Sequence, residues 1–425
     1  TVNKGISVAS SETGTFRVPT GVDSTWNGSY GGRDFNANTG ATLIFDIDGS
    51  FNTTRFLRGE SYTKTGTGTL TLNQTNSFGG TLNVSEGTVI VANSTAGGNA
   101  SGIGGGSASI VIEADGSLVI NGERGTGYHG GSATINGGTL TLNGGDLSFV
   151  NGNTLTFAVA PGTIDGTGYW RRREGGNKVA VTGAASGSTI SVATLNLLDS
   201  NPVFEVFDGA NAADLTISSA IEGSSNLVKT GDGTLVISGV STTYSGTTQV
   251  NGGILQVTGS LSGNMSVGSS GTLAGNGTIG GNTSVFGTLA PGNSPGTLSI
   301  TGNLSLDASA ALAYEINGGD TTVGSGVNDL SIVSGDLTLA GTLNITGSGS
   351  FAGLTEGTSW RLIDYTGSLT DNGLTLGSTP TLDAGSYWHI DTSTPNQVNL
   401  SVIPEPSTAG LALLALAAGA IRRRR

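Results

Sequence analysis

Short runs of alternating apolar and polar residues, separated by turns rich in Gly, Asn and Ser, recur along most of this chain. The clearest stretch is 227–257, LVKTGDGTLVISGVSTTYSGTTQVNGGILQV, with strand-like runs at 234–238, 247–250 and 254–257. Leu235 and Ile237 alternate with polar neighbours, which predicts strands with one apolar face. None of these runs is long enough to bury its apolar face alone. The pattern therefore predicts short β-strands that pack against one another.

The same pattern occurs earlier in the chain. Residues 62–91 read YTKTGTGTLTLNQTNSFGGTLNVSEGTVIV, so that Lys64-Thr65-Gly66 matches Lys229-Thr230-Gly231. Phe78 of the first copy likewise matches Tyr244 of the second. Two matched copies, with weaker relatives such as INGGTLTL between them, predict a protein of stacked repeats.

These matched residues resemble a known family. The series KTGxGTLxL, an aromatic-Ser/Gly-Gly turn and VNGGxLxV is similar to the autotransporter-associated β-strand repeat of bacterial surface proteins. The resemblance implies an all-β fold, a right-handed parallel β-helix (β-solenoid), and it implies little about chemistry. We expect rungs of about 20 residues, stacked at the spacing of neighbouring strands.

Composition agrees with a solenoid and narrows the partners. The chain has 425 residues with 74 Gly, no Cys and 11% charged residues, and its formal net charge is −13. Frequent glycine suits the tight corners of parallel rungs, and the absence of Cys excludes disulfides and Cys-based metal sites. An acidic chain is a poor partner for nucleic acid or an anionic membrane surface. No cofactor is expected.

We expect four parts along the chain. Residues 1–58, enriched in aromatic side chains, would form an N-terminal cap and first rungs, and 59–303 the solenoid repeats. Residues 304–402 would form C-terminal rungs and a cap, and 403–425 a sorting signal. The sequence begins at Thr1 without an initiator Met or an apolar leader, so we expect a removed leader or a truncated start.

The last 25 residues differ from the rest. An uninterrupted apolar run extends from Ala409 to Ile421, and four basic residues follow it, Arg422, Arg423, Arg424 and Arg425. A helix of this length spans about 20 Å, and flanking residues extend its reach towards the roughly 30 Å of a bilayer core. The positive-inside rule places the arginines in the cytoplasm. We expect a short transmembrane helix.

Pro404-Glu405-Pro406, followed by an apolar helix and a basic end, resembles the PEP-CTERM sorting signal. The resemblance implies recognition and cleavage by an exosortase-type membrane enzyme in Gram-negative bacteria that make exopolysaccharide. Pro404, Glu405 and Pro406 would then be the recognition motif of a substrate, and the apolar run a temporary inner-membrane anchor.

One segment suggests ligand binding. Residues 165–178, DGTGYWRRREGGNK, read as a loop in which Tyr169 and Trp170 stand beside three basic residues, Arg171, Arg172 and Arg173. Aromatic rings stack on sugars and guanidinium groups pair with carboxylates, so the loop is a candidate polysaccharide or anion site. The alternative is a solvated loop whose charge Glu174 balances.

Catalytic signatures are sparse. The two GxGxxG strings do not open a helix in a βαβ unit, and the two histidines, His129 and His389, lack a nucleophile elbow. A carboxylate pair for glycan cleavage has no sequence signature and stays open. We therefore expect a non-enzymatic protein of the cell surface or extracellular matrix that associates with exopolysaccharide. The alternatives are a polysaccharide-binding adhesin and a β-helix polysaccharide lyase or hydrolase.

Overall fold

The fold is taken from a computed structural model of the chain. It describes residues 6–26, 34–74, 76–92, 103, 108–122, 127–144, 146–149, 153–172, 178–197, 201–324 and 326–405. By its internal contacts the chain divides into two compact units, Thr1–Thr283 and Ser284–Arg425. Within the described ranges the one helical segment is a 3₁₀ turn, η1 (Gly183–Ala185). The remaining elements are β-strands, so the expected all-β fold is confirmed.

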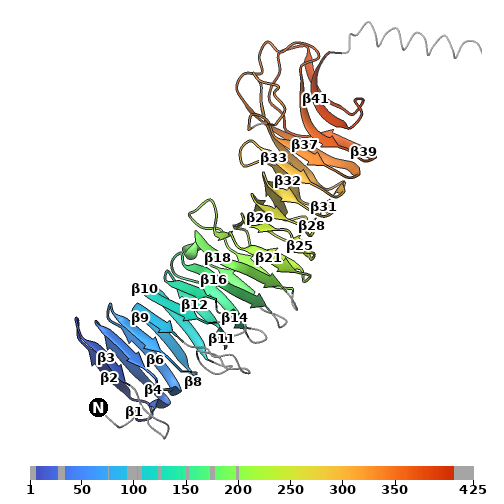
Figure 1. Ribbon diagram of the computed structural model, residues 1–425. Coiled ribbons are helices and arrows are strands. Elements are labelled where there is room, and N and C mark those ends of the chain that lie inside the picture. Colours follow the sequence, from blue (N-terminus) through green and yellow to red (C-terminus); the bar gives the residue numbers. More distant parts are fainter. Residues whose placement is uncertain are drawn as a thin grey trace, which may run out of the picture. The chain divides into compact units, whose positions relative to one another are not determined.

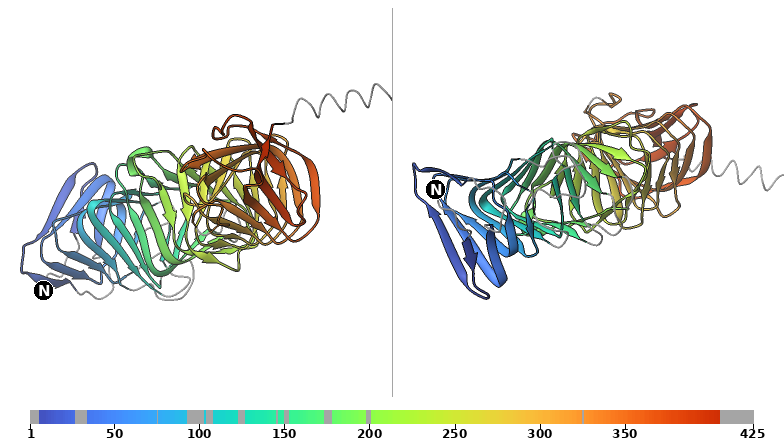
Figure 2. Two further views of the ribbon diagram at one scale, coloured as in Figure 1. Left: turned by 90° about the horizontal axis from the view of Figure 1, so that it is seen from above. Right: turned by 60° about the horizontal axis from the view of Figure 1, so that its bottom comes forward.

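In the first unit the strands form three parallel columns (Figures 1 and 2), and the chain visits each column once per turn. Six long strands bend at a corner and contribute to two columns each: β4 (Phe35–Ile47), β6 (Leu57–Thr65), β9 (Thr81–Val91), β10 (Ser109–Asn121), β16 (Thr163–Arg172) and β18 (Ser188–Leu197).

The shorter strands complete the columns. The first column adds β2 (Thr13–Val18), β12 (Ala133–Asn136), β15 (Thr154–Phe157), β17 (Lys178–Val181), β19 (Val203–Val206), β22 (Leu227–Thr230), β25 (Thr247–Val250) and β28 (Asn264–Val267). The second adds β3 (Asp23–Trp26), β5 (Ser50–Thr53), β7 (Thr69–Leu72), β13 (Thr139–Asn143), β20 (Leu215–Ile217), β23 (Thr234–Ile237), β26 (Gly253–Val257) and β29 (Gly271–Gly275). The third adds β1 (Ile6–Val8), β8 (Ser77–Phe78), β11 (Gly127–Gly130), β14 (Asp146–Phe149) and β21 (Ala220–Gly223), and a separate short column holds β24 (Val240–Ser241), β27 (Ser260–Leu261) and β30 (Thr278–Ile279).

Register explains why such short strands are stable. In the second column each inward aliphatic residue lies over that of the next turn, and the side chains of this aliphatic ladder are fully buried: Leu70, Val89, Leu118, Leu140, Ile164, Ile190, Ile217, Ile237 and Val257. Leu70 pairs with Val89, and Leu235 with Leu255, so one turn takes about 20 residues, as expected. The hand of the coil stays a prediction.

The aromatic residues near the N-terminus pack inside the first turns. Phe35, Phe45 and Phe51 are buried, and the rings of Phe16 and Phe51 lie 4.7 Å apart. Phe16 and Trp26 remain partly exposed at the N-terminal end of this cluster. A capping role for 1–58, like the other expected domain limits, stays a prediction.

The second unit continues the parallel arrangement and ends differently. Its strands are β31 (Thr283–Val285), β32 (Thr288–Pro291), β33 (Thr297–Ile300), β34 (Leu304–Leu306), β35 (Ala311–Asn317), β36 (Leu330–Val333), β37 (Leu337–Ser348), β38 (Ser359–Tyr365), β39 (Leu369–Leu376), β40 (Ser386–Asp391) and β41 (Gln397–Pro404). β41 pairs antiparallel with both β38 and β40. The rings of Phe351, Trp360 and Trp388 pack together near this hairpin, with centroids 5.5–6.1 Å apart.

Among the described residues, no helix combines the length and the apolar character needed to cross a bilayer. The expected transmembrane helix, from Ala409 to Ile421, lies outside these residues.

Candidate functional site

Each matched repeat buries its lysine at the corner between the first and second columns. Lys64 and Lys229 have no exposed surface, and their ammonium groups donate hydrogen bonds to main-chain carbonyls. The acceptors of Lys64 are the carbonyls of Thr65 (2.8 Å), Gly66 (2.6 Å), Ile47 (3.2 Å) and Glu86 (3.2 Å). Those of Lys229 belong to Thr230 (2.9 Å), Gly231 (2.9 Å) and Gly252 (3.1 Å).

These lysines have a structural role. Burial lowers the pKa of both Lys64 and Lys229 to about 8, and nearby carboxylates, Glu86 and Asp214 foremost, act in the opposite direction. All the recorded hydrogen-bond acceptors are main-chain oxygens, so each ammonium ties together two successive turns at a corner. Sequence analysis missed this role, although the matched Lys-Thr-Gly series with Lys at an inward strand position was its signal.

The expected ligand loop at 165–178 is wrong in its first half, because Thr163–Arg172 is the strand β16. Trp170 lies between Leu147 and Leu195 of neighbouring turns and has no exposed surface. Its ring is therefore not available to stack on a sugar. Tyr169 is half-buried in the same strand. The side chains of Arg171 and Arg172, and all of Arg173, lie outside the described part.

The start of the expected sorting motif rests on the C-terminal hairpin. Pro404 is the last residue of β41 and pairs with Ser386 of β40. The main-chain N–H of Glu405 donates to the carbonyl oxygen of Gly385 (2.7 Å), and the Tyr387 hydroxyl donates to Glu405 Oε1 (3.2 Å). Pro406, the segment from Ala409 to Ile421, and Arg422 to Arg425 lie outside the described residues.

The candidates for catalysis are not brought together as a site. His389 lies in β40, where its carbonyl accepts a bond from Ser401, and the Asp391 carboxylate accepts the Ser393 N–H at 2.9 Å. The side chain of His129 is outside the described part. Across the part of the chain that the structure describes, no three His, Cys, Asp or Glu residues converge to hold a metal ion.

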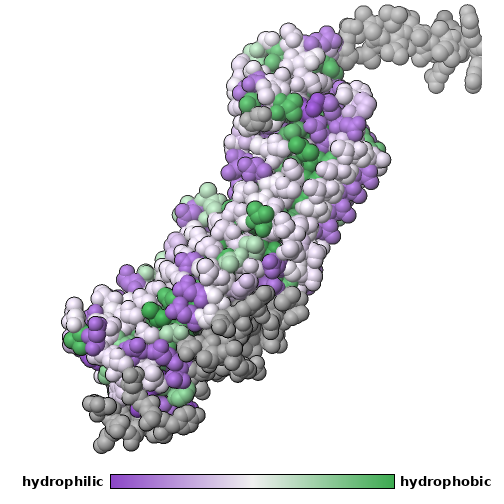
Figure 3. Space-filling model, viewed as in Figure 1, coloured by the Kyte–Doolittle hydropathy of each residue, from purple (hydrophilic) through white to green (hydrophobic). Residues whose placement is uncertain are grey.

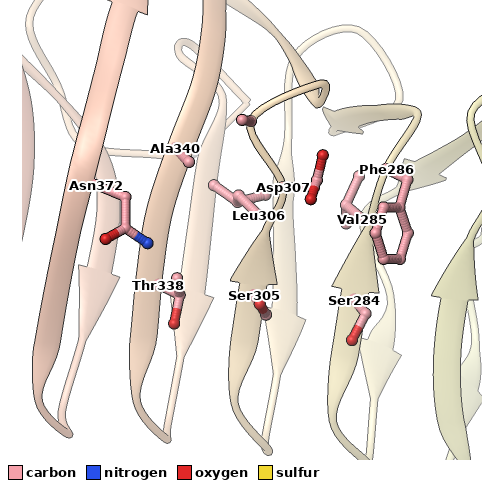
Figure 4. A pocket seen from close by; sticks show the side chains of 10 residues that line it. Ser284, Val285, Phe286, Ser305, Leu306, Asp307, Thr338, Ala340 and Asn372 are labelled. Atoms are coloured by element: carbon pink, nitrogen blue, oxygen red, sulfur yellow. The ribbon is translucent and has the colours of Figure 1, made fainter.

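A hollow on the surface of the second unit joins an aromatic ring to polar groups (Figure 4). Its volume is about 370 Å³, and we call it the Phe286 groove. Its lining residues come from successive turns: Ser284, Val285, Phe286, Ser305, Leu306, Asp307, Ala308, Thr338, Ala340 and Asn372. Sequence analysis did not find this groove, because its residues come from segments widely separated in the chain.

Comparison with known proteins supports the repeat. Residues 63–91 and 227–257 match the family described as passenger-associated-transport-repeat. Each matched segment begins in the first column and takes in both a Lys-Thr-Gly corner and the next turn of the aliphatic ladder, so the family match and the stacking coincide.

Two curated proteins share parts of the chain. The adhesin BmaC autotransporter of Brucella suis biovar 1 (strain 1330) is 40% identical over 118 residues, which is 27% of this chain and 3% of that protein. An extracellular serine protease of Serratia marcescens is 39% identical over 84 residues, 20% of this chain and 8% of that protein. The chain thus matches only a small share of either relative. What these findings support is the repeat family: the chain is a β-solenoid that carries two copies of the passenger-associated-transport-repeat.

Proposed function

We propose that this chain is an exported, non-enzymatic β-solenoid, displayed at the cell surface or in the extracellular matrix of a Gram-negative bacterium. The observation that carries the proposal is the coincidence of both repeat matches, 63–91 and 227–257, with stacked turns of a parallel solenoid. The adhesin BmaC autotransporter and the extracellular serine protease share such segments.

The surface suits an exposed molecule. Most of the face in Figure 3 is pale, with small separate hydrophobic and hydrophilic patches, as expected for a chain with 11% charged residues. Its acidic net charge of −13 favours solubility and disfavours nucleic acid as a partner.

Buried ionisable groups favour a structural role over an enzymatic one. Like the two buried lysines, Asp329 is almost fully buried and bonds the main chain: its carboxylate accepts the N–H of Gly296 (2.8 Å) and of Glu315 (2.7 Å). Burial raises the pKa of Asp329 to about 6. Shifted pKa values often mark active sites, but these groups hold neighbouring strands in place. The protease activity of the Serratia relative is not transferred, because the shared segment is 8% of that protein.

Delivery is proposed to use the C-terminal signal. An exosortase-type enzyme recognises Pro404, Glu405 and Pro406, while the segment from Ala409 to Ile421 anchors the chain transiently in the inner membrane and Arg422 to Arg425 face the cytoplasm. After cleavage the solenoid associates with exopolysaccharide. The support for this step is the sequence resemblance of the last 25 residues.

The test is fractionation of the full chain in a Gram-negative host that makes exopolysaccharide and carries an exosortase. We expect the solenoid in the surface and matrix fractions, accessible to added protease, and a mature C-terminus that lacks Arg422 to Arg425 by mass spectrometry. The variant with Pro404 and Glu405 both changed to Ala should stay uncleaved in the membrane fraction. Retention of the wild-type chain in the cytoplasm contradicts export, and intact arginines on surface-exposed protein contradict cleavage alone.

A further inference from the structure

The Phe286 groove runs across successive strands of one sheet. In Figure 4, Ser284, Ser305 and Thr338 lie in a row on β31, β34 and β37, and Asn372 lies on the next strand, β39. Ser305 and Thr338 are register partners. Because neighbouring strands are about 4.8 Å apart, the row presents a polar group at nearly that repeat. The rings of an extended polysaccharide chain recur at a similar spacing.

A tight turn builds the wall of the groove on the side of β34. The carbonyl of Asp307 accepts the N–H of Ala310 at 3.0 Å, and the N–H of Asp307 donates to the carbonyl of Val285 at 2.9 Å. Asp307 Oδ1 accepts both the N–H (2.9 Å) and the hydroxyl (2.8 Å) of Ser309. These bonds fix the carboxylate in an exposed position and hold the pKa of Asp307 below its usual value, the Ser309 N–H being the larger cause.

Phe286 supplies the apolar part of the groove. Its residue is 46% exposed, although the flanking Val285 is buried. The Ser309 hydroxyl donates to the Phe286 carbonyl at 3.0 Å, which ties the aromatic residue to the Asp307 turn. An exposed ring beside anchored polar groups is the composition of a small-molecule site, where an apolar surface gives contact area and a few polar groups give orientation.

We propose that the Phe286 groove binds one or two sugar units of a neutral glycan. The Phe286 ring covers the C–H face of a sugar, the Asp307 carboxylate accepts a sugar hydroxyl, and Ser305, Thr338 and Asn372 bond hydroxyls of the chain that lies along the row. This proposal rests on the proposed surface function and gives its glycan partner a site and a chemical class.

Charge selects the class. None of the ten residues that line the groove is basic, and one is a carboxylate. The whole chain carries a net charge of −13. A uronic-acid polymer would bring like charge to Asp307 without a guanidinium or ammonium to pair with, which disfavours binding. A neutral glycan carries no such penalty.

The test is affinity electrophoresis of the full chain through gels that contain soluble β-1,3-glucan, dextran, alginate or polygalacturonate. Wild-type chain should be retarded by at least one neutral glucan and by neither acidic polymer. Phe286→Ala should weaken retardation by about tenfold, and Asp307→Asn by a smaller factor. Phe286→Ala leaves the main-chain bond to Ser309 in place, so it should fold as wild type does, with an unchanged urea midpoint.

Phe207→Ala is the matched control. Phe207 has nearly the same exposure, 44%, but belongs to the first unit and not to the groove. Equal loss in both Phe variants, or no loss in Phe286→Ala, overturns the site. Retardation by the acidic polymers alone overturns the neutral class, and no retardation in any gel overturns the proposal. Surface fractionation of the same chain distinguishes each of these failures from failure of the proposed function.

Discussion

At the scale of single residues, a lysine pointing into an apolar interior looks like an error, and the structure shows why it is tolerated. An ammonium without partners costs several kcal/mol to bury. At Lys64 and Lys229 the corner of the solenoid turns carbonyl oxygens inwards, and these replace the lost water. The lysine in turn satisfies carbonyls that would otherwise be buried without a donor.

Replacing Lys229 with Met tests this account. Met keeps the apolar stem but leaves the carbonyls of Thr230, Gly231 and Gly252 without their donor, so we expect a loss of about 2–4 kcal/mol in the free energy of unfolding, measured in urea. Lys178→Met is the control: Lys178 lies in the same unit, makes a partly exposed ion pair with Glu205, and should cost less than about 1 kcal/mol. Equal effects of the two variants would refute the carbonyl role.

Glycine at a corner answers two demands, and two variants separate them. Gly231 has φ +77° and an added Cβ would lie 2.3 Å from the Val206 carbonyl oxygen; Gly21 has φ +72° and open space around it. Gly21→Ala should cost about 1 kcal/mol for its left-handed backbone, and Gly231→Ala clearly more, because the turn below must also move. Thermal unfolding of both variants measures the difference, and similar costs would show that stacking does not constrain Gly231.

At the scale of elements, the C-terminal hairpin departs from the parallel plan. The sequence predicted C-terminal rungs and a cap, and its aromatic enrichment pointed to the cluster of Phe351, Trp360 and Trp388. It did not predict that β41 would pair antiparallel between β38 and β40. Strand direction depends on how the chain returns to the sheet, and the alternation of 397–404 is the same in either direction.

This hairpin also places the first two residues of the proposed sorting motif against folded protein. Removing the Tyr387 hydroxyl, as Tyr387→Phe, should release Glu405 and speed cleavage by an exosortase about two- to fivefold, the effect of one exposed charge-assisted bond. A pulse-chase of the full chain in the fractionation host measures the rate. Tyr365→Phe, which removes a hydroxyl from β38, should leave it unchanged, and an unchanged rate in Tyr387→Phe would show that the contact does not limit access.

At the scale of the whole molecule, each unit is held together by contacts between neighbouring turns. Leu235 contacts the turns before and after it through its register partners Leu215 and Leu255, and reaches no further along the ladder. Stability in such a stack is a sum of nearest-neighbour terms. A local defect should therefore loosen its own turn and the adjoining ones.

Amide hydrogen exchange of Leu235→Ala tests this expectation. The substitution leaves a cavity and should cost about 2–5 kcal/mol locally. Protection should fall in β20, β23 and β26, and stay near the wild-type level in β7, several turns away in the same unit. A uniform loss across the unit would instead indicate one cooperative unfolding unit and would contradict the nearest-neighbour account.

The sequence by itself determined the features that depend on local pattern. Alternation at Leu235 and Ile237 required one apolar face, and strands too short to bury that face alone required stacking. The spacing of the two Lys-Thr-Gly copies and their following strands gave a turn of about 20 residues, which the register confirms. These properties follow from the period of a strand and from the need to cover apolar surface, whatever the partners are.

Only the tertiary structure decided which residues face the interior and which meet across turns. Trp170 belongs to a segment that reads as a solvated loop, yet strands from neighbouring turns pair with it on both sides and bury its ring. Phe286, Asp307 and Asn372 share one groove because register, not sequence distance, sets their neighbours. A local pattern specifies that a strand forms, whereas the identity of its neighbours depends on how many residues each turn contains.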